Sequence, residues 1–238
     1  RLVLRTSQTT YDFFLFPYTK HVALFFAGKA CKFASCLCFT HPESRDAYKK
    51  MGLIKGEAGK KIRIIGHGVD AKIFKPLNLK KAGKKTILLS VAALIKVKGH
   101  QNAIKAAKSL IDKNYNIELW IAGEGSYKKE LEELAENLGI ASHVKFLGAL
   151  SHGELVKVYN KAGIFVFSNL SDVTPAVSEA MLCKLPVVAA SCNGLDFVMP
   201  SEKHGIVTKH DNAEDLARGI EKLMLDKKLQ RRVAANAR

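Results

Sequence analysis

The chain has 238 residues, of which 47% are hydrophobic and 25% charged, a composition typical of a folded protein with a substantial core. No apolar run reaches the roughly 18 residues that a membrane-spanning helix needs, and the first residues lack the pattern of a signal peptide. With 38 Lys and Arg against 22 Asp and Glu, the net charge of +16 makes nucleic acid, anionic lipid or a phosphorylated substrate candidate partners.

Nucleic-acid binding and metal binding receive little support from the sequence. Basic residues do not alternate with aromatic residues of the kind that stack on bases. The five cysteines are an odd number in apolar surroundings, which favours a reducing compartment over a disulfide framework. Cys31, Cys36, Cys38 and His41 match no standard zinc spacing, so we favour buried structural cysteines.

The first third of the chain is predicted to contain three strands and two helices. The strands are expected at residues 1–5, 35–40 and 61–65. A polar loop from Thr6 to Asp12 leads to a first helix at about 17–33, and His41 opens a second helix that runs to Lys50. The segment GHGVDAKIFKP, residues 66–76, carries two glycines and a proline and is predicted to connect two domains.

From Lys85 onward, strands and helices alternate regularly, which predicts right-handed crossovers and a doubly wound parallel sheet. Strands are expected at residues 86–92, 117–122, 144–147, 164–167, 185–190 and 205–207. Helices are expected around 103–111 and 131–138, at 154–161, after Thr174, at 212–225 and from Lys228. The Gly123-Glu124-Gly125 segment lacks the third glycine of a dinucleotide fingerprint and is interpreted as a tight strand-to-helix turn.

The stretch from Gly163 to Gly194 is predicted to form strand, loop, helix and strand. Thr174 is a good N-cap residue and Pro175 suits the first helical position; the helix is expected to continue to about Lys184. The amides of Ala176, Val177 and Ser178 should then be free to bind an anion. One turn further, Glu179 can accept hydrogen bonds from vicinal hydroxyls such as those of a ribose.

These segments together resemble the nucleotide-sugar domain of retaining GT-B glycosyltransferases of the large family 4 group. The resemblance rests on GHGVDAKIFKP, SVAALIKVKGH, WIAGEGSYKKELEELAENLGI, VKFLGALSHGELVKVYNKA and SEAMLCKLPVVAASCNG, in the order and at the spacing of that family. It covers about residues 61–230. It implies a Rossmann-like nucleotide-sugar-binding domain at 77–238, preceded at 1–76 by the end of an amino-terminal acceptor-side domain, so the chain is expected to be part of a longer polypeptide.

The resemblance also implies roles for single residues. Lys98, together with Thr174 and Ala176 at the start of the helix, matches the positions that bind the donor diphosphate, and Glu179 matches the glutamate that holds the ribose. The backbone around Phe146 and Gly148 matches the loop that receives the base. No metal or other cofactor is expected, and no catalytic residue is assigned. A solvated loop lysine, a surface carboxylate and a simple N-cap are the alternatives for Lys98, Glu179 and Thr174.

Two positions depart from the pattern of the family. Its second glutamate, eight residues before the ribose glutamate, is replaced by Ser171, with Asp172 beside it in the donor-sugar region. Its arginine partner for the lysine is replaced by Ala93, where Lys96 could supply a charge but not a bidentate guanidinium.

The expected function is sugar transfer from a nucleoside-diphosphate sugar to a glycan or lipid-linked acceptor, with retention, in the cytoplasm or at a membrane surface. The isolated segment is expected to be inactive. The alternatives are a non-catalytic nucleotide-sugar-binding relative, a basic module that binds a polyanion or membrane, and a sugar-nucleotide epimerase of the same architecture.

Overall fold

The computed structural model describes residues 3–6, 20–79, 83 and 85–236. Contacts within the chain divide it into two units, Arg1–Gly68 with Asn193–Phe197, and Val69–Cys192 with Val198–Arg238. Most of the loop predicted for 6–12, and the predicted start of the first helix at Pro17, lie outside the described residues.

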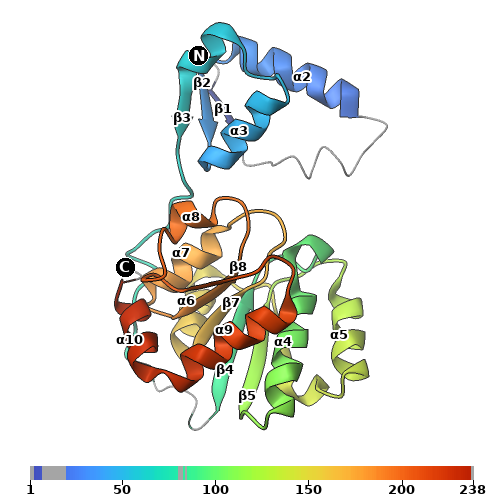
Figure 1. Cartoon of the computed structure of the whole chain (residues 1–238), viewed down its shortest axis with the longest axis vertical. Helices are drawn as coiled ribbons and strands as arrows, with labels where there is room; N and C mark the ends of the chain where they lie inside the picture. Colours follow the sequence, from blue (N-terminus) through green and yellow to red (C-terminus); the bar gives the residue numbers. More distant parts are fainter. Residues whose placement is uncertain (1–2, 7–19, 80–82, 84, 237–238) are drawn as a thin grey trace. The chain divides into compact units, whose positions relative to one another are not determined.

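The smaller unit has a parallel three-stranded sheet in the order β1-β2-β3 (Figure 1). Its elements are β1 (Val3–Thr6), α2 (Lys20–Phe33), β2 (Cys36–Phe39), α3 (Pro42–Lys50) and β3 (Ile62–Ile64). The α3 helix begins as predicted, because the His41 ring accepts a hydrogen bond from the Ser44 amide at 3.3 Å and Pro42 lies in the first turn. In the core of this unit the Phe39 and Tyr48 rings meet edge to face.

The larger unit contains a parallel six-stranded sheet in the order β6-β5-β4-β7-β8-β9. Its strands are β4 (Thr86–Val91), β5 (Ile117–Ala122), β6 (Val144–Gly148), β7 (Ile164–Phe167), β8 (Val187–Ala190) and β9 (Ile206–Thr208). This order confirms the predicted doubly wound α/β fold, since the chain winds outward from β4 to β6 and then returns to place β7 on the other side of β4.

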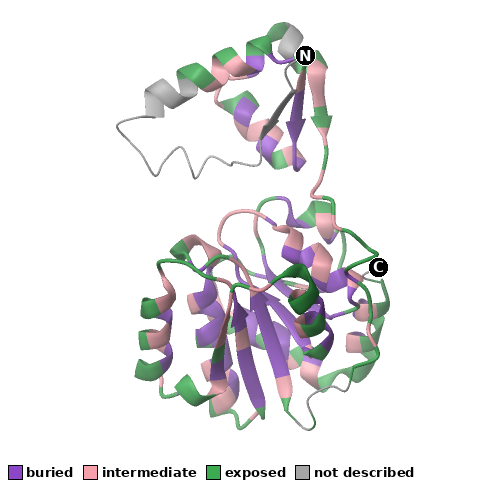
Figure 2. Cartoon of the chain, turned by 180° about the vertical axis from the view of Figure 1, so that it is seen from behind, coloured by how far each residue is buried: buried purple, intermediate pink, exposed green. Residues whose placement is uncertain are grey.

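Helices cover both faces of this sheet (Figure 1). They are α4 (His100–Asp112), α5 (Lys128–Asn137), α6 (His152–Lys161), α7 (Pro175–Leu182), α9 (Ala213–Leu225) and α10 (Lys227–Asn236). Alternate strand residues such as Leu88 and Val166 pack in one core with α4, α5 and α9, whereas Phe165 contacts Tyr159 of α6 on the opposite face. Strands covered on both faces are buried along most of their length, as Figure 2 shows, which explains their unbroken apolar runs.

Some local features differ from expectation. The α7 helix ends at Leu182 rather than near Lys184, because Lys184 has a left-handed φ of +56° that a continuing helix cannot accommodate. The short helix α8 (Leu195–Val198) and the 3₁₀ helix Gly56–Lys61 were not predicted.

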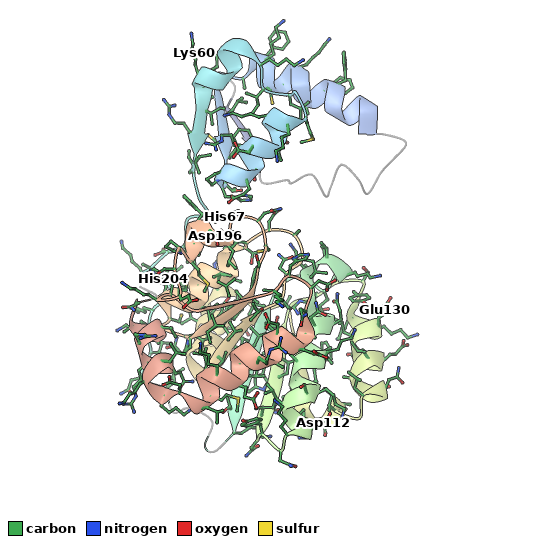
Figure 3. All side chains as sticks on the ribbon, viewed as in Figure 1. Lys60, His67, Asp112, Glu130, Asp196 and His204 are labelled. Atoms are coloured by element: carbon green, nitrogen blue, oxygen red, sulfur yellow. The ribbon has the colours of Figure 1, made fainter. Side chains whose placement is uncertain are left out.

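Charged side chains coat the outer surface of the larger unit (Figure 3). Glu130 projects from the first turn of α5, and Asp112 lies at the last residue of α4, where it pairs with Lys108. In the part of the chain that the structure describes, no helix combines the length and apolar character needed to cross a bilayer.

Candidate functional site

The sheet order of the larger unit creates a switch point between β4 and β7. The connections that leave these adjacent strands lead to helices on opposite faces, α4 on one side and α7 on the other. In open parallel sheets, ligands bind in the crevice outside the carboxyl ends of the strands at such a point. The two loops that begin here, residues 92–99 and 168–174, are the ones in which the sequence predicts the diphosphate and sugar positions.

Direct backbone contacts join these two loops. The Leu170 amide donates a hydrogen bond to the Val97 carbonyl at 2.9 Å. Gly99 has a φ of +71°, and a Cβ atom on it would overlap the Ser168 carbonyl oxygen. Lys98 lies between Val97 and Gly99, half-buried at the end of a 3₁₀ helix. The structure therefore fixes the backbone of Lys98 beside the loop that leads to Thr174.

The Gly123-Glu124-Gly125 turn supports the β4–α4 loop from its other side. Cβ atoms on Gly123 and Gly125 would overlap the carbonyl oxygens of Ala92 and Leu94. The Leu94 amide in turn donates to the Glu124 carbonyl at 2.8 Å. The tight strand-to-helix turn predicted here is confirmed, and its two glycines are explained by the close approach of the loop that carries Lys98.

The N-terminus of α7 is formed by Thr174 and Pro175, as predicted. The Thr174 side chain makes no capping hydrogen bond, and within the described part of the chain its buried Oγ1 has no hydrogen-bond partner. One prediction about the amides is wrong: the Val177 N–H donates to the Thr174 carbonyl at 3.2 Å and is not free for an anion. The predicted diphosphate residue Ala176 is buried in the first turn.

Glu179 lies in the second turn of α7, where its carboxylate accepts a hydrogen bond at 2.8 Å from the buried Tyr159 hydroxyl. Burial raises the pKa of Glu179, while the Tyr159 hydrogen bond and the nearby His152 ring oppose the rise. Burial, followed by the negative charge of Glu179, raises the pKa of Cys183 to about 11. The predicted ribose residue is thus a partly desolvated carboxylate with a specific partner rather than a solvated surface acid.

The predicted donor-sugar residues lie in a turn organised by Asn169, which is 1% exposed. The Ser171 amide and hydroxyl both donate to the Asn169 side-chain oxygen at 3.2 Å, and the Asn169 amide group donates to the Asp172 carbonyl at 2.6 Å. These bonds hold Ser171 and Asp172 in the loop between β7 and α7.

The predicted base position lies at the carboxyl end of β6, separated from β4 by β5. Phe146 is half-buried against the core, and Gly148 has a φ of +72°. The Gly148 carbonyl accepts a hydrogen bond from the Gly123 amide at 2.8 Å, and a Cβ on Gly148 would lie 3.0 Å from a carboxylate oxygen of Glu124. The base position is therefore connected through the glycine turn to the loop of Lys98.

Two positions depart from the family pattern. Ala93 lies in the loop between β4 and α4, and Ser171 lies in the adjacent loop between β7 and α7. Ala93 is exposed. Lys96 is exposed too and lines a groove between α4 and α5 with Gln101, Lys105 and Glu130. A role for Lys96 as the second cation at the diphosphate stays a prediction.

Three residues that contribute to this region were not singled out from the sequence. Gly99 and Asn169 each follow a strand or precede a helix, where glycine and asparagine are common without any further role. Tyr159 sits near the end of an amphipathic helix and is 20 positions from Glu179. No local pattern identifies such a pair.

In comparisons with known proteins, a glycosyltransferase family and named glycosyltransferases match this chain. The family described as glycosyl transferases group 1 matches residues 72–238. An uncharacterized glycosyltransferase of Methanocaldococcus jannaschii is 30% identical over 153 residues, which cover 64% of this chain and 39% of the relative. The sulfoquinovosyl transferase of Arabidopsis thaliana is 26% identical over 194 residues, which cover 76% and 36%. The chain spans less than half of the length of these two relatives.

Among solved structures, the Anabaena protein HepE in complex with UDP matches with a TM-score of 0.83 and 21% identity, covering 99% of this chain and 66% of that chain. At this identity the likeness concerns the fold, which is the α/β fold of GT-B proteins. The family match extends over more than half of the chain. The chain therefore belongs to the glycosyl transferases group 1 family.

Proposed function

We propose that this chain is the nucleotide-sugar-binding part of a retaining glycosyltransferase of family 4. Its donor would be a UDP-, GDP- or ADP-sugar, and its acceptor a glycan or a lipid-linked sugar. The proposal assigns the diphosphate to Lys98, Thr174 and Ala176, and the ribose to Glu179. It assigns the base to the backbone near Phe146 and Gly148, and the donor sugar to the loop of Ser171 and Asp172.

One observation carries this proposal. At the switch point between β4 and β7, backbone contacts join the loop of Lys98 to the loop that leads to the N-terminus of α7, where the Thr174 hydroxyl is buried without a hydrogen-bond partner among the described residues. A buried polar atom without a partner costs about 1–3 kcal/mol. A phosphate oxygen that accepts from this hydroxyl would remove that cost, and the helix dipole and the lysine favour the same anion.

The chemistry expected at this site is stabilisation of a leaving group. When the glycosidic bond to the donor breaks, negative charge grows on the diphosphate, and fixed cations and N–H dipoles lower the energy of that state without a metal. Lys98 supplies a full charge and the first turn of α7 supplies partial charge. The acceptor and the catalytic groups that meet the sugar are not assigned to residues of this chain, and inactivity of the isolated segment stays a prediction.

The names of the relatives favour transfer of a sugar, since the Arabidopsis protein is a sulfoquinovosyl transferase. The net charge of +16 is compatible with peripheral contact with an anionic membrane from the cytoplasm, and gives nucleic acid no specific support. Ser171 and Ala93 favour the second candidate, a relative that binds the nucleotide sugar without transferring it.

A thermal-shift screen of the 238-residue chain tests nucleotide binding. UDP, GDP, ADP and their glucose conjugates would each be added at millimolar concentration, with inorganic pyrophosphate and NAD as comparison ligands. A ligand at ten times its Kd stabilises by about 1.4 kcal/mol, which corresponds to about 3–6 °C in Tm. The shift should be reduced in Glu179→Gln and kept in Glu221→Gln, since Glu221 bonds to Lys113 and Tyr115 away from the predicted site residues. Absence of any shift with all six nucleotides would overturn the proposal.

Transfer itself separates the two candidate functions. If a nucleotide sugar binds but the longest available form of the protein transfers no sugar to any acceptor, restoring the family glutamate by Ser171→Glu is the decisive variant. A gain of transfer supports an enzyme with a redirected donor, whereas unchanged binding with no transfer supports the non-catalytic relative.

A further inference from the structure

Tyr159 joins α6 to two successive turns of α7. Its hydroxyl donates a hydrogen bond to Oε2 of Glu179 at 2.8 Å and lies 3.3 Å from the Ala176 carbonyl oxygen. Tyr159 is 1% exposed, so water cannot take the place of this donor. The hydroxyl thus contacts both the backbone of the first turn of α7 and the carboxylate of the second.

The second carboxylate oxygen of Glu179 is available to a ligand. Within the part of the chain that the structure describes, Oε1 accepts no hydrogen bond, and Glu179 itself is only half-buried. A hydrogen bond from a buried donor to one carboxylate oxygen restricts rotation of the carboxylate, and so narrows the directions in which the other oxygen can point. Such preorganisation lowers the entropy lost when a diol binds.

The ring of Tyr159 is held by aromatic residues on its other sides. Phe74, which is 3% exposed, meets it edge to face with ring centroids 6.0 Å apart, and Phe165 of β7 lies at 5.7 Å. Phe74 also meets the His152 ring at 5.8 Å. Tyr159 therefore packs between Phe165 of the sheet and Phe74, which lies in the segment that precedes β4.

Hydrogen bonds attach the segment of Phe74, residues 74–77, to α6, the helix of Tyr159. The amide of Leu77 donates to the Asn160 side-chain oxygen at 2.6 Å, and the Asn160 amide group donates to the Lys75 carbonyl at 3.0 Å. Asn160 directly follows Tyr159 on α6. Residues 74–77, at the end of the predicted connector, are thereby attached to α6 at the position of Tyr159.

We propose that Tyr159 is a positioning residue that holds the Glu179 carboxylate for the ribose hydroxyls, and that Phe74 holds the Tyr159 ring in place. The segment 74–77 would then contribute to nucleotide binding without touching the ligand. This inference rests on the proposed function, because it concerns the assigned ribose residue. It goes beyond that assignment by naming what orients the carboxylate.

The electrostatic surroundings of Glu179 agree with this arrangement. The groups that face it are Tyr159 and His152 from α6, and Cys183, the residue that directly follows α7. Burial raises the pKa of Glu179, and the Tyr159 hydrogen bond is the largest opposing contribution. Without that hydrogen bond the carboxylate should protonate at a higher pH, and protonation removes one acceptor that a diol requires.

The test compares Tyr159→Phe with a matched variant. Tyr115→Phe removes a similar hydrogen bond, from the Tyr115 hydroxyl to Glu221 at 3.0 Å, away from the predicted site residues. Isothermal titration would use whichever of UDP, GDP and ADP binds the chain best, together with its 2′-deoxy analogue. Tyr159→Phe is expected to weaken the ribonucleotide about tenfold and the 2′-deoxy analogue much less. Tyr115→Phe should change neither by more than about twofold.

Two further readouts distinguish positioning from loss of structure. The pH at which affinity falls by half should move upward in Tyr159→Phe, and the loss caused by Tyr159→Phe should vanish in a Glu179→Gln background. Phe74→Leu should move the pH midpoint in the same direction with a smaller loss of affinity. Equal losses in both backgrounds, or an unmoved midpoint, would overturn the proposal.

The failure of the proposed function has a different signature. A ¹³C NMR titration of the Glu179 carboxyl group requires no nucleotide, and its midpoint should rise in Tyr159→Phe. If it rises but no nucleotide binds the unmodified chain, the hydrogen bond is real and its role in ribose binding falls together with the proposed function. If nucleotide binds and the midpoint does not move, only the present inference is overturned.

Discussion

Gly99 and Ser168 pack backbone against backbone at the point where the loops after β4 and β7 meet. A Cβ atom on Gly99 would overlap the Ser168 carbonyl oxygen. Gly99 also has a φ of +71°, which residues with a Cβ atom rarely adopt. Beside this contact, the Leu170 amide donates to the Val97 carbonyl at 2.9 Å. Main-chain packing therefore sets the relative position of the two loops. Lys98 lies between Val97 and Gly99, the two residues that make these contacts.

Replacement of Gly99 by alanine should separate the two loops. The left-handed φ costs about 1 kcal/mol for a residue with a Cβ atom, and the overlap with Ser168 should add at least about 2 kcal/mol. Gly139→Ala is the matched control, because Gly139 has a φ of +69° and open space around its Cα atom. Urea unfolding should show a markedly larger loss for Gly99→Ala. Similar losses for both variants would mean that the contact with Ser168 carries no strain.

Lys98 is expected to bind the diphosphate, so its removal should affect ligands only when they carry phosphates. Lys98→Ala should weaken UDP or GDP binding about tenfold and reduce its salt dependence, because a charged contact is lost. Binding of the corresponding nucleoside should not change. Lys129→Ala, at a side chain that is 85% exposed on α5, serves as the control for net charge. Equal effects of the two variants would assign Lys98 to the general charge of the surface.

Much of the fold follows from local pattern. Apolar runs of four to six residues between amphipathic segments predict buried parallel strands, and the structure places strands at all of these runs. Thr174 and Pro175 predict the start of α7 because the N-cap and first helical position have strong residue preferences. Glu179 consequently falls in the second turn, at the end of the sheet where the sequence predicts the site.

The remaining features depend on contacts between segments that are distant in sequence. Tyr159 and Glu179 lie on different helices, and only the sheet order brings them together. In the sequence, Gly99 is compatible with an ordinary helix start. Its close contact with Ser168 can be recognised only once β7 is known to lie beside β4. Lys184 ends α7 in a left-handed conformation that lysine seldom adopts, so no residue preference could have predicted it.

Thr174→Val should change stability and binding in opposite directions. Valine has nearly the shape of threonine, and the hydroxyl that it removes is buried without a partner among the described residues. Stability in urea should be unchanged or higher by about 1 kcal/mol, whereas affinity for a nucleoside diphosphate should fall. Ser151→Ala is the contrasting variant, since Ser151 caps α6 through reciprocal hydrogen bonds with Glu154. It should cost about 1 kcal/mol and leave binding unchanged. A loss of stability in Thr174→Val would show that its hydroxyl has a structural partner.

The stability of the chain should depend on pH through His100, the first residue of α4. His100 is fully buried, and burial, with a further contribution from the charge of Lys98, lowers its pKa to about 4, while the backbone of Ala92 and Ala93 opposes the shift. The unfolded chain binds a proton at this residue below a pH of about 6.5, while the folded chain does not until a pH of about 4. Stability is therefore lost as the pH falls through this window, by about 3 kcal/mol in total.

His100→Gln removes the titrating group and retains a polar side chain that can reach the Ser90 hydroxyl, which bonds to the His100 ring at 3.2 Å. Unfolding free energies measured in urea from pH 7 to pH 4.5 should fall less steeply in this variant, by up to about 1.4 kcal/mol per pH unit. A slope that is identical in the unmodified chain and in His100→Gln would show that His100 is protonated to the same extent in the folded and unfolded states, and that the acid sensitivity has another source.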